Sequence, residues 1–178
     1  MSRRIKWAMF VVTAIGNFIA MLDSTTVNLA LYPMSVDLHV TMGQIQWVMI
    51  AYMLVLTVLL PFFGKLGDIF PKNKLYATGF SVFSLGAFLS MVAPNFISLI
   101  AFRCLEAMGA SIMLSNAQAI IARIFSRERR GKALGLNGCI VAIGGMCGPA
   151  VGGFIINYFG WHFVFYSSSH LSQGLSHG

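Results

Sequence analysis

Three ionisable side chains, Asp23, Arg103 and Glu106, fall inside long apolar stretches of this 178-residue sequence. A charge inside the hydrocarbon of a membrane is costly unless it pairs with an opposite charge or faces water. Residues of this kind mark a substrate route or a proton route. A purely structural ion pair that holds helices together is the alternative, and the residues themselves leave both interpretations open.

Counting along the chain places these groups at similar depth. Arg103 follows the start of its apolar stretch at Phe96 by about 10 Å, at a rise of ~1.5 Å per residue. Asp23 precedes the end of its own stretch at Leu31 by about 12 Å on the same rise. We therefore expect Arg103 and Asp23 to pair between helices. Glu106 follows Arg103 by three positions, a spacing at which side chains on one helix meet.

The elements that carry these residues are predicted to be membrane-spanning helices at 7–31, 45–64, 75–93, 96–121 and 133–157. Each is close to the ~20 residues that a helix needs to cross the hydrocarbon. Helices satisfy their own backbone hydrogen bonds in lipid, and the alternating pattern of a β-barrel is absent. The sequence is 57% hydrophobic and 10% charged, whereas soluble domains are about a quarter charged. The predicted fold class is an all-α membrane protein.

The basic residues predict the orientation of these helices. Eleven of the twelve fall in three clusters, at the amino terminus and in alternate connections. These eleven are Arg3, Arg4, Lys6, Lys65, Lys72, Lys74, Arg123, Arg127, Arg129, Arg130 and Lys132. The positive-inside rule then predicts a multi-pass protein of the inner membrane with a cytoplasmic amino terminus. Because the clusters also account for the net charge of +7, we predict no nucleic-acid partner.

Metal and enzymatic chemistry find no support in the sequence. The three cysteines lie in apolar segments without the spacing of a zinc site or a disulfide framework. His170 and His177 lie in a polar carboxy-terminal stretch that predicts disorder, which is a poor setting for a metal site. No metalloprotease, serine-hydrolase or phosphate-loop motif is present. We predict that the chain is not an enzyme and uses no metal or cofactor.

A stripe of small residues marks the fifth predicted span. Gly144, Gly148 and Gly152 recur every four residues, so they share one helix face and allow close approach of a neighbouring backbone. Pro149 removes one hydrogen bond of the helix and is expected to bend it. A stiff, bent helix suits a rocking element, while simple close packing is the alternative.

Four segments carry a family resemblance: LDSTTVNLAL at 22–31, GKLGDIFPKNK at 64–74, RCLEAMGA at 103–110 and GGMCGPAVGG at 144–153. Together they resemble the signatures of the major facilitator superfamily, and specifically of its multidrug:proton antiporter branch with fourteen helices. The last segment fits the antiporter pattern G-x-x-x-G-P-x-x-G-G at every fixed position, through Gly153. The resemblance covers about residues 5–166.

The resemblance implies roles for named residues. Arg103 and Asp23 match positions that the family uses in proton coupling. Gly64, Asp68, Lys72 and Lys74 match a cytoplasmic loop that acts in gating, where the aspartate joins a latch between the transporter halves. From its surroundings alone, Asp68 could cap the next helix or bridge to Arg127 or Arg130 of the following cytoplasmic connection. An ordinary solvated turn residue is the alternative.

The sequence also departs from the family pattern. Glu106 replaces the usual glutamine and Ala107 the usual glycine, while Ile69 and Pro71 replace the usual arginine and glycine of the loop. An acid beside Arg103 can either neutralise it or add a protonatable group. The changes in the loop bear on the strength of the inner latch.

Residues 1–166 are therefore expected to form part of an amino-terminal six-helix half, and 167–178 a disordered polar tail. The resemblance implies an exporter of small lipophilic, often cationic compounds that is driven by the proton gradient. Its carboxy-terminal half, which would complete the substrate route, is the missing partner. The alternative is a membrane fragment that does not transport, or an assembly partner for a separate carboxy-terminal piece.

Overall fold

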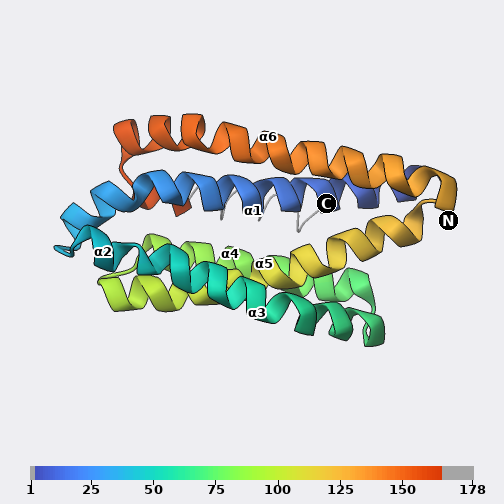
Figure 1. Ribbon diagram of the computed structural model, residues 1–178, viewed down its shortest axis with the longest axis horizontal. Helices are drawn as coiled ribbons and strands as arrows, with labels where there is room; N and C mark the ends of the chain where they lie inside the picture. The colour runs from blue at the N-terminus through green and yellow to red at the C-terminus, as the bar shows by residue number, and fades with distance from the viewer. Residues whose placement is uncertain (1–2, 166–178) are drawn as a thin grey trace.

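The computed structural model describes residues 3–165, which form six helices joined by short turns (Figure 1). Their bounds are α1 (Arg3–Asp37), α2 (Met42–Ile45), α3 (Trp47–Ile69), α4 (Lys72–Met91), α5 (Phe96–Ile124) and α6 (Arg127–Phe159). The five long helices run along one axis, and their connections alternate between the two ends of the bundle (Figure 1). One helical turn, residues 162–165, follows α6. The predicted tail at 167–178 lies outside the described residues.

Four helical segments are long and apolar enough to cross a membrane, namely Lys6–Asp37, Met42–Ile69, Phe96–Ile124 and Arg127–Phe159. The third predicted span, 75–93, falls on α4, which is 20 residues long but is not among the four. Two lysines in its first turn, together with three serines and two glycines, lower its mean hydropathy. Even so, α4 lies beside α5 in the bundle (Figure 1).

The helices extend past the predicted spans, and this corrects the expected connections. The second connection shrinks to Phe70 and Pro71, and the fourth to Phe125 and Ser126. Hydrophobicity reports only the part of a helix that lies in lipid, whereas backbone hydrogen bonds and polar side chains allow the helix to continue in water. The basic residues consequently lie mostly on helix ends rather than in loops.

Local signals fix where α5 begins. Asn95 caps the helix, because its side-chain oxygen accepts a hydrogen bond from the Ser98 backbone N–H at 2.9 Å. In return, the Asn95 backbone N–H donates to the Ser98 hydroxyl at 3.3 Å. This reciprocal arrangement is a capping box, which satisfies donors that the first helical turn leaves free.

Helix α5 is the centre of the bundle, packed between α3 and α4 and also touching α1, while α6 packs mainly on α1. Glycines permit the closest approaches. At Gly109 of α5 an added Cβ would overlap the backbone of Phe83 in α4, and at Gly79 of α4 it would lie 2.6 Å from Ile112. These two helices therefore form a tightly packed pair.

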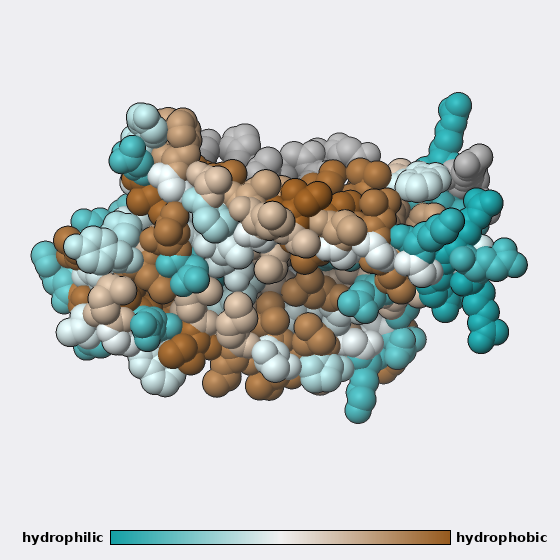
Figure 2. All heavy atoms as spheres, turned by 45° about the horizontal axis from the view of Figure 1, so that its top comes forward, coloured by the Kyte–Doolittle hydropathy of each residue, from teal (hydrophilic) through white to brown (hydrophobic). Residues whose placement is uncertain are grey.

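The surface agrees with a membrane setting. Figure 2 shows hydrophobic side chains across the middle of the molecule, with extended hydrophilic side chains gathered at one end. Exposed large apolar residues are frequent on α3 and α6, including Leu54, Val58, Met146 and Phe154. Such faces suit contact with lipid or with further helices.

Candidate functional site

The charged residues of the apolar stretches meet at one buried point. The Nη1 atom of Arg103 in α5 donates to Asp23 Oδ2 of α1 at 2.8 Å and to Glu106 Oε2 of its own helix at 2.9 Å. All three side chains are completely buried. The pairing expected from depth is therefore present, and so is the pairing within α5. We call Asp23, Arg103 and Glu106 the charge cluster.

Aromatic rings enclose the guanidinium of Arg103. Its central carbon lies 4.3 Å from the centroid of the Tyr52 ring of α3 and 5.6 Å from that of Phe165, after α6. A cation within about 6 Å of a ring centre is attracted to the face of the ring. The sequence analysis missed both aromatic residues. Nothing in their spacing relates them to Arg103, since they come from separate parts of the chain.

Gly86 of α4 packs directly against the backbone of Glu106. A Cβ added to Gly86 would lie 2.6 Å from both the backbone nitrogen and the Cα of Glu106. Any larger residue would therefore push α4 away from the segment that carries both Arg103 and Glu106. Gly79 and Gly86 are seven residues apart and therefore lie on one face of α4, so their spacing in the sequence indicates a closely packed face.

The charge cluster is unbalanced. With both carboxylates ionised, two negative charges face one guanidinium, so its formal charge is −1. Within residues 3–165, Arg103 Nε and Nη2 and Glu106 Oε1 have no hydrogen-bond partner. A buried net charge is costly, and unused donors and acceptors add to the cost. A proton on one of the two carboxylates would make the charge cluster neutral.

The small-residue stripe of α6 packs directly on α1. A Cβ on Gly144 would lie 2.9 Å from the carbonyl oxygen of Phe18, and one on Gly152 would lie 2.6 Å from Thr26 Cγ2. At Gly148 it would overlap the hydroxyl of Thr25. The Thr26 hydroxyl also donates to the Gly148 carbonyl at 3.1 Å, which ties the two helices together.

The remaining residues of this motif differ in their contacts. Pro149 lies inside α6, which continues to Phe159. A Cβ added to Gly153 would make ordinary contact with Leu29, at 3.6 Å. The close contact between α6 and α1 thus rests on the three stripe glycines. Asp23 lies on the α1 segment that they face, between Phe18 and Thr26.

The predicted gating loop is not a loop in this structure. Gly64 and Asp68 lie in α3, and Lys72 and Lys74 lie in α4. Asp68 neither caps α4 nor pairs with Arg127 or Arg130 among the described ion pairs; it accepts from Lys72 Nζ at 3.1 Å. The Asp68 side chain is 79% exposed, so this pair contributes little by itself.

A neighbouring contact of this motif was missed. At Gly67, the buried glycine just before Asp68, an added Cβ would overlap the amide of Asn116 in α5. Gly67 therefore sets how closely the last turns of α3 approach α5. Gly67 belongs to the segment 64–74 that carries the family resemblance. Its contact with Asn116 could not be predicted, because Asn116 lies far along the chain.

An open cavity of about 580 Å³ lies between α1, α3, α5 and α6. Its polar lining consists of Asn17, Ser115, Gln118 and Asn137, and none of the described residues that line it is charged. The Asn17 amide donates to Asn137 at 3.2 Å, while the Asn17 carbonyl oxygen is buried without a partner within residues 3–165. The sequence analysis missed this site, because uncharged polar residues in apolar helices were not weighed.

Comparison with known proteins fits this architecture. The family model of the Major Facilitator Superfamily matches residues 13–172. The riboflavin transporter RibZ of Clostridioides difficile (strain 630) is 42% identical over 160 residues, covering 90% of this chain and 35% of that protein. The multidrug transporter protein MdtP of Bacillus subtilis (strain 168) is 33% identical over 152 residues, covering 85% and 28% respectively.

Solved structures agree on the fold. The proton:xylose symporter XylE, bound to 6-bromo-6-deoxy-D-glucose, superposes with a TM-score of 0.86 at 11% identity, over 99% of this chain and 44% of that one. The chain thus spans about a third of the length of the curated relatives and under half of this structural neighbour. It is a multi-pass membrane protein with an incomplete amino-terminal helical bundle, and it belongs to the Major Facilitator Superfamily.

Proposed function

We propose that this chain forms part of a proton-coupled carrier of small organic molecules in the inner membrane, with its amino terminus in the cytoplasm. The observation that carries the proposal is the buried, unbalanced charge cluster inside a bundle of this family. The orientation is supported by the basic residues other than Arg103, which lie near helix ends that meet at one end of the bundle (Figure 1).

Proton coupling follows from the charge count. One proton on either carboxylate neutralises the charge cluster, which removes the cost of burying its net charge. Arg103 joins α1 to α5 through Asp23 and bonds Glu106 within α5. A proton on Asp23 weakens the link between the helices, whereas a proton on Glu106 leaves it intact. Proton binding thereby alters the contact between α1 and α5, which a rocking transporter can use.

The substrate that we favour is a neutral, polar heteroaromatic molecule of the riboflavin type. Amide and hydroxyl groups in the cavity can pair with ring nitrogens and carbonyls, and apolar residues such as Leu60 and Leu114 flank them. The described residues of this lining include no carboxylate, so they offer a cation no ion pair. The 42% identity to RibZ over nearly the whole chain supports the same choice.

Export of lipophilic drugs is the second candidate. It is supported by the glycine–proline motif of α6, which resembles the fourteen-helix multidrug:proton antiporter branch, and by the similarity to MdtP. In either case, transport requires a carboxy-terminal half to rock against, so that half is the partner that we propose. A chain that acts only as a non-transporting membrane fragment, or as an assembly partner for such a half, remains the competing proposal.

A chimera tests these proposals. Residues 3–165 would replace the matching segment of RibZ, and the purified chimera would be placed in proteoliposomes. We expect riboflavin counterflow, which needs no driving force, and riboflavin accumulation when a proton gradient is imposed. Asp23→Asn should keep counterflow and lose accumulation, while Asp37→Asn, an acid outside the cluster, should keep both.

The possible results separate the proposals. Accumulation that Asp23→Asn leaves unchanged contradicts proton coupling through the charge cluster. Efflux of a cationic dye without any riboflavin counterflow favours the drug exporter. A chimera that folds and inserts but moves neither compound supports the non-transporting alternative.

A further inference from the structure

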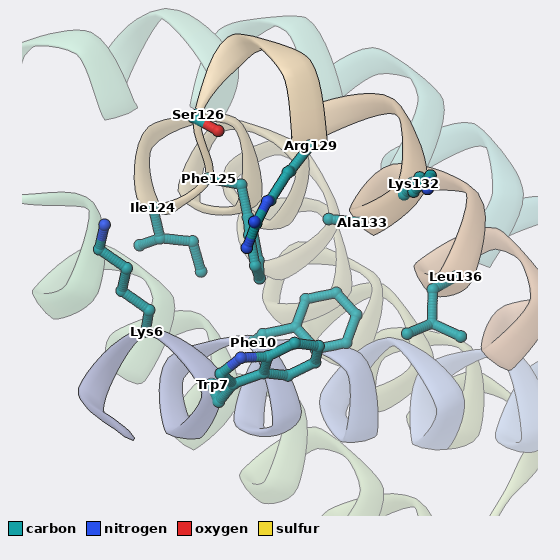
Figure 3. A pocket seen from close by; sticks show the side chains of 10 residues that line it. All are labelled: Lys6, Trp7, Phe10, Ile124, Phe125, Ser126, Arg129, Lys132, Ala133 and Leu136. Atoms are coloured by element: carbon teal, nitrogen blue, oxygen red, sulfur yellow. The ribbon is translucent and has the colours of Figure 1, made fainter. Parts of the chain in front are cut away.

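A second cavity opens at the end of the bundle where the basic residues gather. It has a volume of about 610 Å³ and lies between the start of α1, the end of α5 and the start of α6. The first residues of α1 meet the α5–α6 turn here (Figure 3). This cavity is separate from both the charge cluster and the uncharged cavity, and no role described above uses it.

The cavity is strongly cationic. Lys6, Arg129 and Lys132 line it, and the part of the chain that the structure describes contributes no acidic residue to the lining. Figure 3 shows the guanidinium of Arg129 extending from α6 towards the rings below it, while Lys6 rises from α1 on the opposite side. Three cations around one hollow repel each other. An anion between them would relieve this repulsion and accept their hydrogen bonds.

The opposite wall of the cavity is aromatic. Trp7, Phe10 and Phe125 pack edge to face, with all three pairs of ring centroids 5.7 to 5.8 Å apart. Trp7 nevertheless remains 45% exposed. Tryptophan at this position is typical of the headgroup level of a membrane. The cavity thus presents cationic groups beside an exposed apolar surface, as an anionic amphiphile requires.

We propose that this cavity binds the phosphate headgroup of an anionic phospholipid. The phosphate would lie beside Arg129, with Lys6 and Lys132 on the two sides of the cavity (Figure 3), and an acyl chain would pass over Trp7 into the bilayer. Basic pockets between transmembrane helices are suited to such headgroups. The binding itself does not depend on transport, and only the identity of the leaflet that supplies the lipid rests on the orientation proposed above.

The test is lipid binding by the purified 178-residue chain in an uncharged detergent. Phosphatidylglycerol, phosphatidylcholine with the same acyl chains, and inorganic phosphate are titrated separately, with binding followed by native mass spectrometry and by thermal stability. We expect phosphatidylglycerol to bind at least ~10-fold more tightly than phosphatidylcholine, since each nearby cation favours an anionic headgroup. Equal binding of the two lipids would overturn the proposal, as would inorganic phosphate that stabilises the chain as well as the lipid does.

Matched variants locate the site. The triple variant Lys6→Gln, Arg129→Gln, Lys132→Gln should lose at least ~10-fold in phosphatidylglycerol affinity. The control Arg123→Gln, Arg127→Gln, Arg130→Gln removes the same charge at the same end but outside the cavity lining, and should stay within ~2-fold. An equal loss in both triples would mean general surface attraction and would contradict a site. The single variant Arg129→Gln supplies the same comparison, against Arg130→Gln, if the triple variant does not fold.

Discussion

Two glycines of α6, Gly148 in the stripe and Gly135 outside it, are expected to change the stability of the protein in opposite directions when each is replaced by alanine. At Gly148, alanine would place a methyl group into the Thr25 hydroxyl and 3.2 Å from the Leu22 carbonyl oxygen. The single O–H of Thr25 is already shared between the carbonyl oxygens of Met21 and Leu22, at 3.0 Å each, so rotating the hydroxyl away loses this shared hydrogen bond. At Gly135, by contrast, an added Cβ meets nothing within 4 Å.

The magnitudes follow from these contacts. Overpacking a tight interface costs about 1–3 kcal/mol, and replacing glycine by alanine inside a helix returns roughly 0.5–1 kcal/mol. Gly148→Ala should therefore lose about 1–2 kcal/mol, while Gly135→Ala should gain up to ~1 kcal/mol. For a chain of this size about 1 kcal/mol corresponds to ~2–4 °C in Tm.

Thermal unfolding of the two purified variants in the same detergent is the appropriate assay. We expect Gly148→Ala to melt roughly 2–8 °C below the parent chain, and Gly135→Ala to melt at or slightly above it. If Gly148→Ala melts at as high a temperature as Gly135→Ala, then α6 does not pack on α1 through its glycine stripe.

Three further outcomes are expected. Arg103→Leu removes the cation that faces two buried acids and should cost about 3–5 kcal/mol. Adding Asp23→Asn should restore part of the lost Tm, and no restoration would argue against the pairing of Asp23 with Arg103. Asp68→Asn should change stability by less than ~1 kcal/mol, because its ion pair is exposed, and a large drop in Tm would show a partner that the structure lacks. Trp161→Phe removes the 2.8 Å hydrogen bond that the indole N–H donates to Asp37. The substitution should cost ~1.5–3 kcal/mol, because the acceptor is a carboxylate. An unchanged Tm would show that water replaces this hydrogen bond.

Much of the fold could be predicted because membrane helices are encoded locally. The length of the apolar stretches located the helices, and the fixed rise per residue of a helix placed Asp23 and Arg103 at similar depths in the membrane. The ends of the helices could not be predicted in this way. A helix leaving the membrane keeps its hydrogen bonds while its side chains become polar, so Gly64 and Asp68 were placed in a loop although they belong to α3.

The surroundings of the candidate sites depended on contacts between distant segments. Tyr52 and Phe165 reach Arg103 only through the packing of separate helices, and Gly86 supports Glu106 from another helix. The uncharged cavity around Asn17 was beyond prediction for the same reason. Amide and serine side chains in apolar helices form a polar site only when packing brings four helices together around one cavity.

We propose that the charge cluster of Asp23, Arg103 and Glu106 holds an exchangeable proton. Infrared difference spectroscopy of the chain in membranes, recorded across a pH titration, detects the carboxylic acid band of a protonated buried acid. We predict one such band that changes with pH and disappears in the double variant Asp23→Asn, Glu106→Gln, but persists in Asp37→Asn. A titration without any buried carboxylic acid band, or a band that the double variant leaves unchanged, would contradict the account.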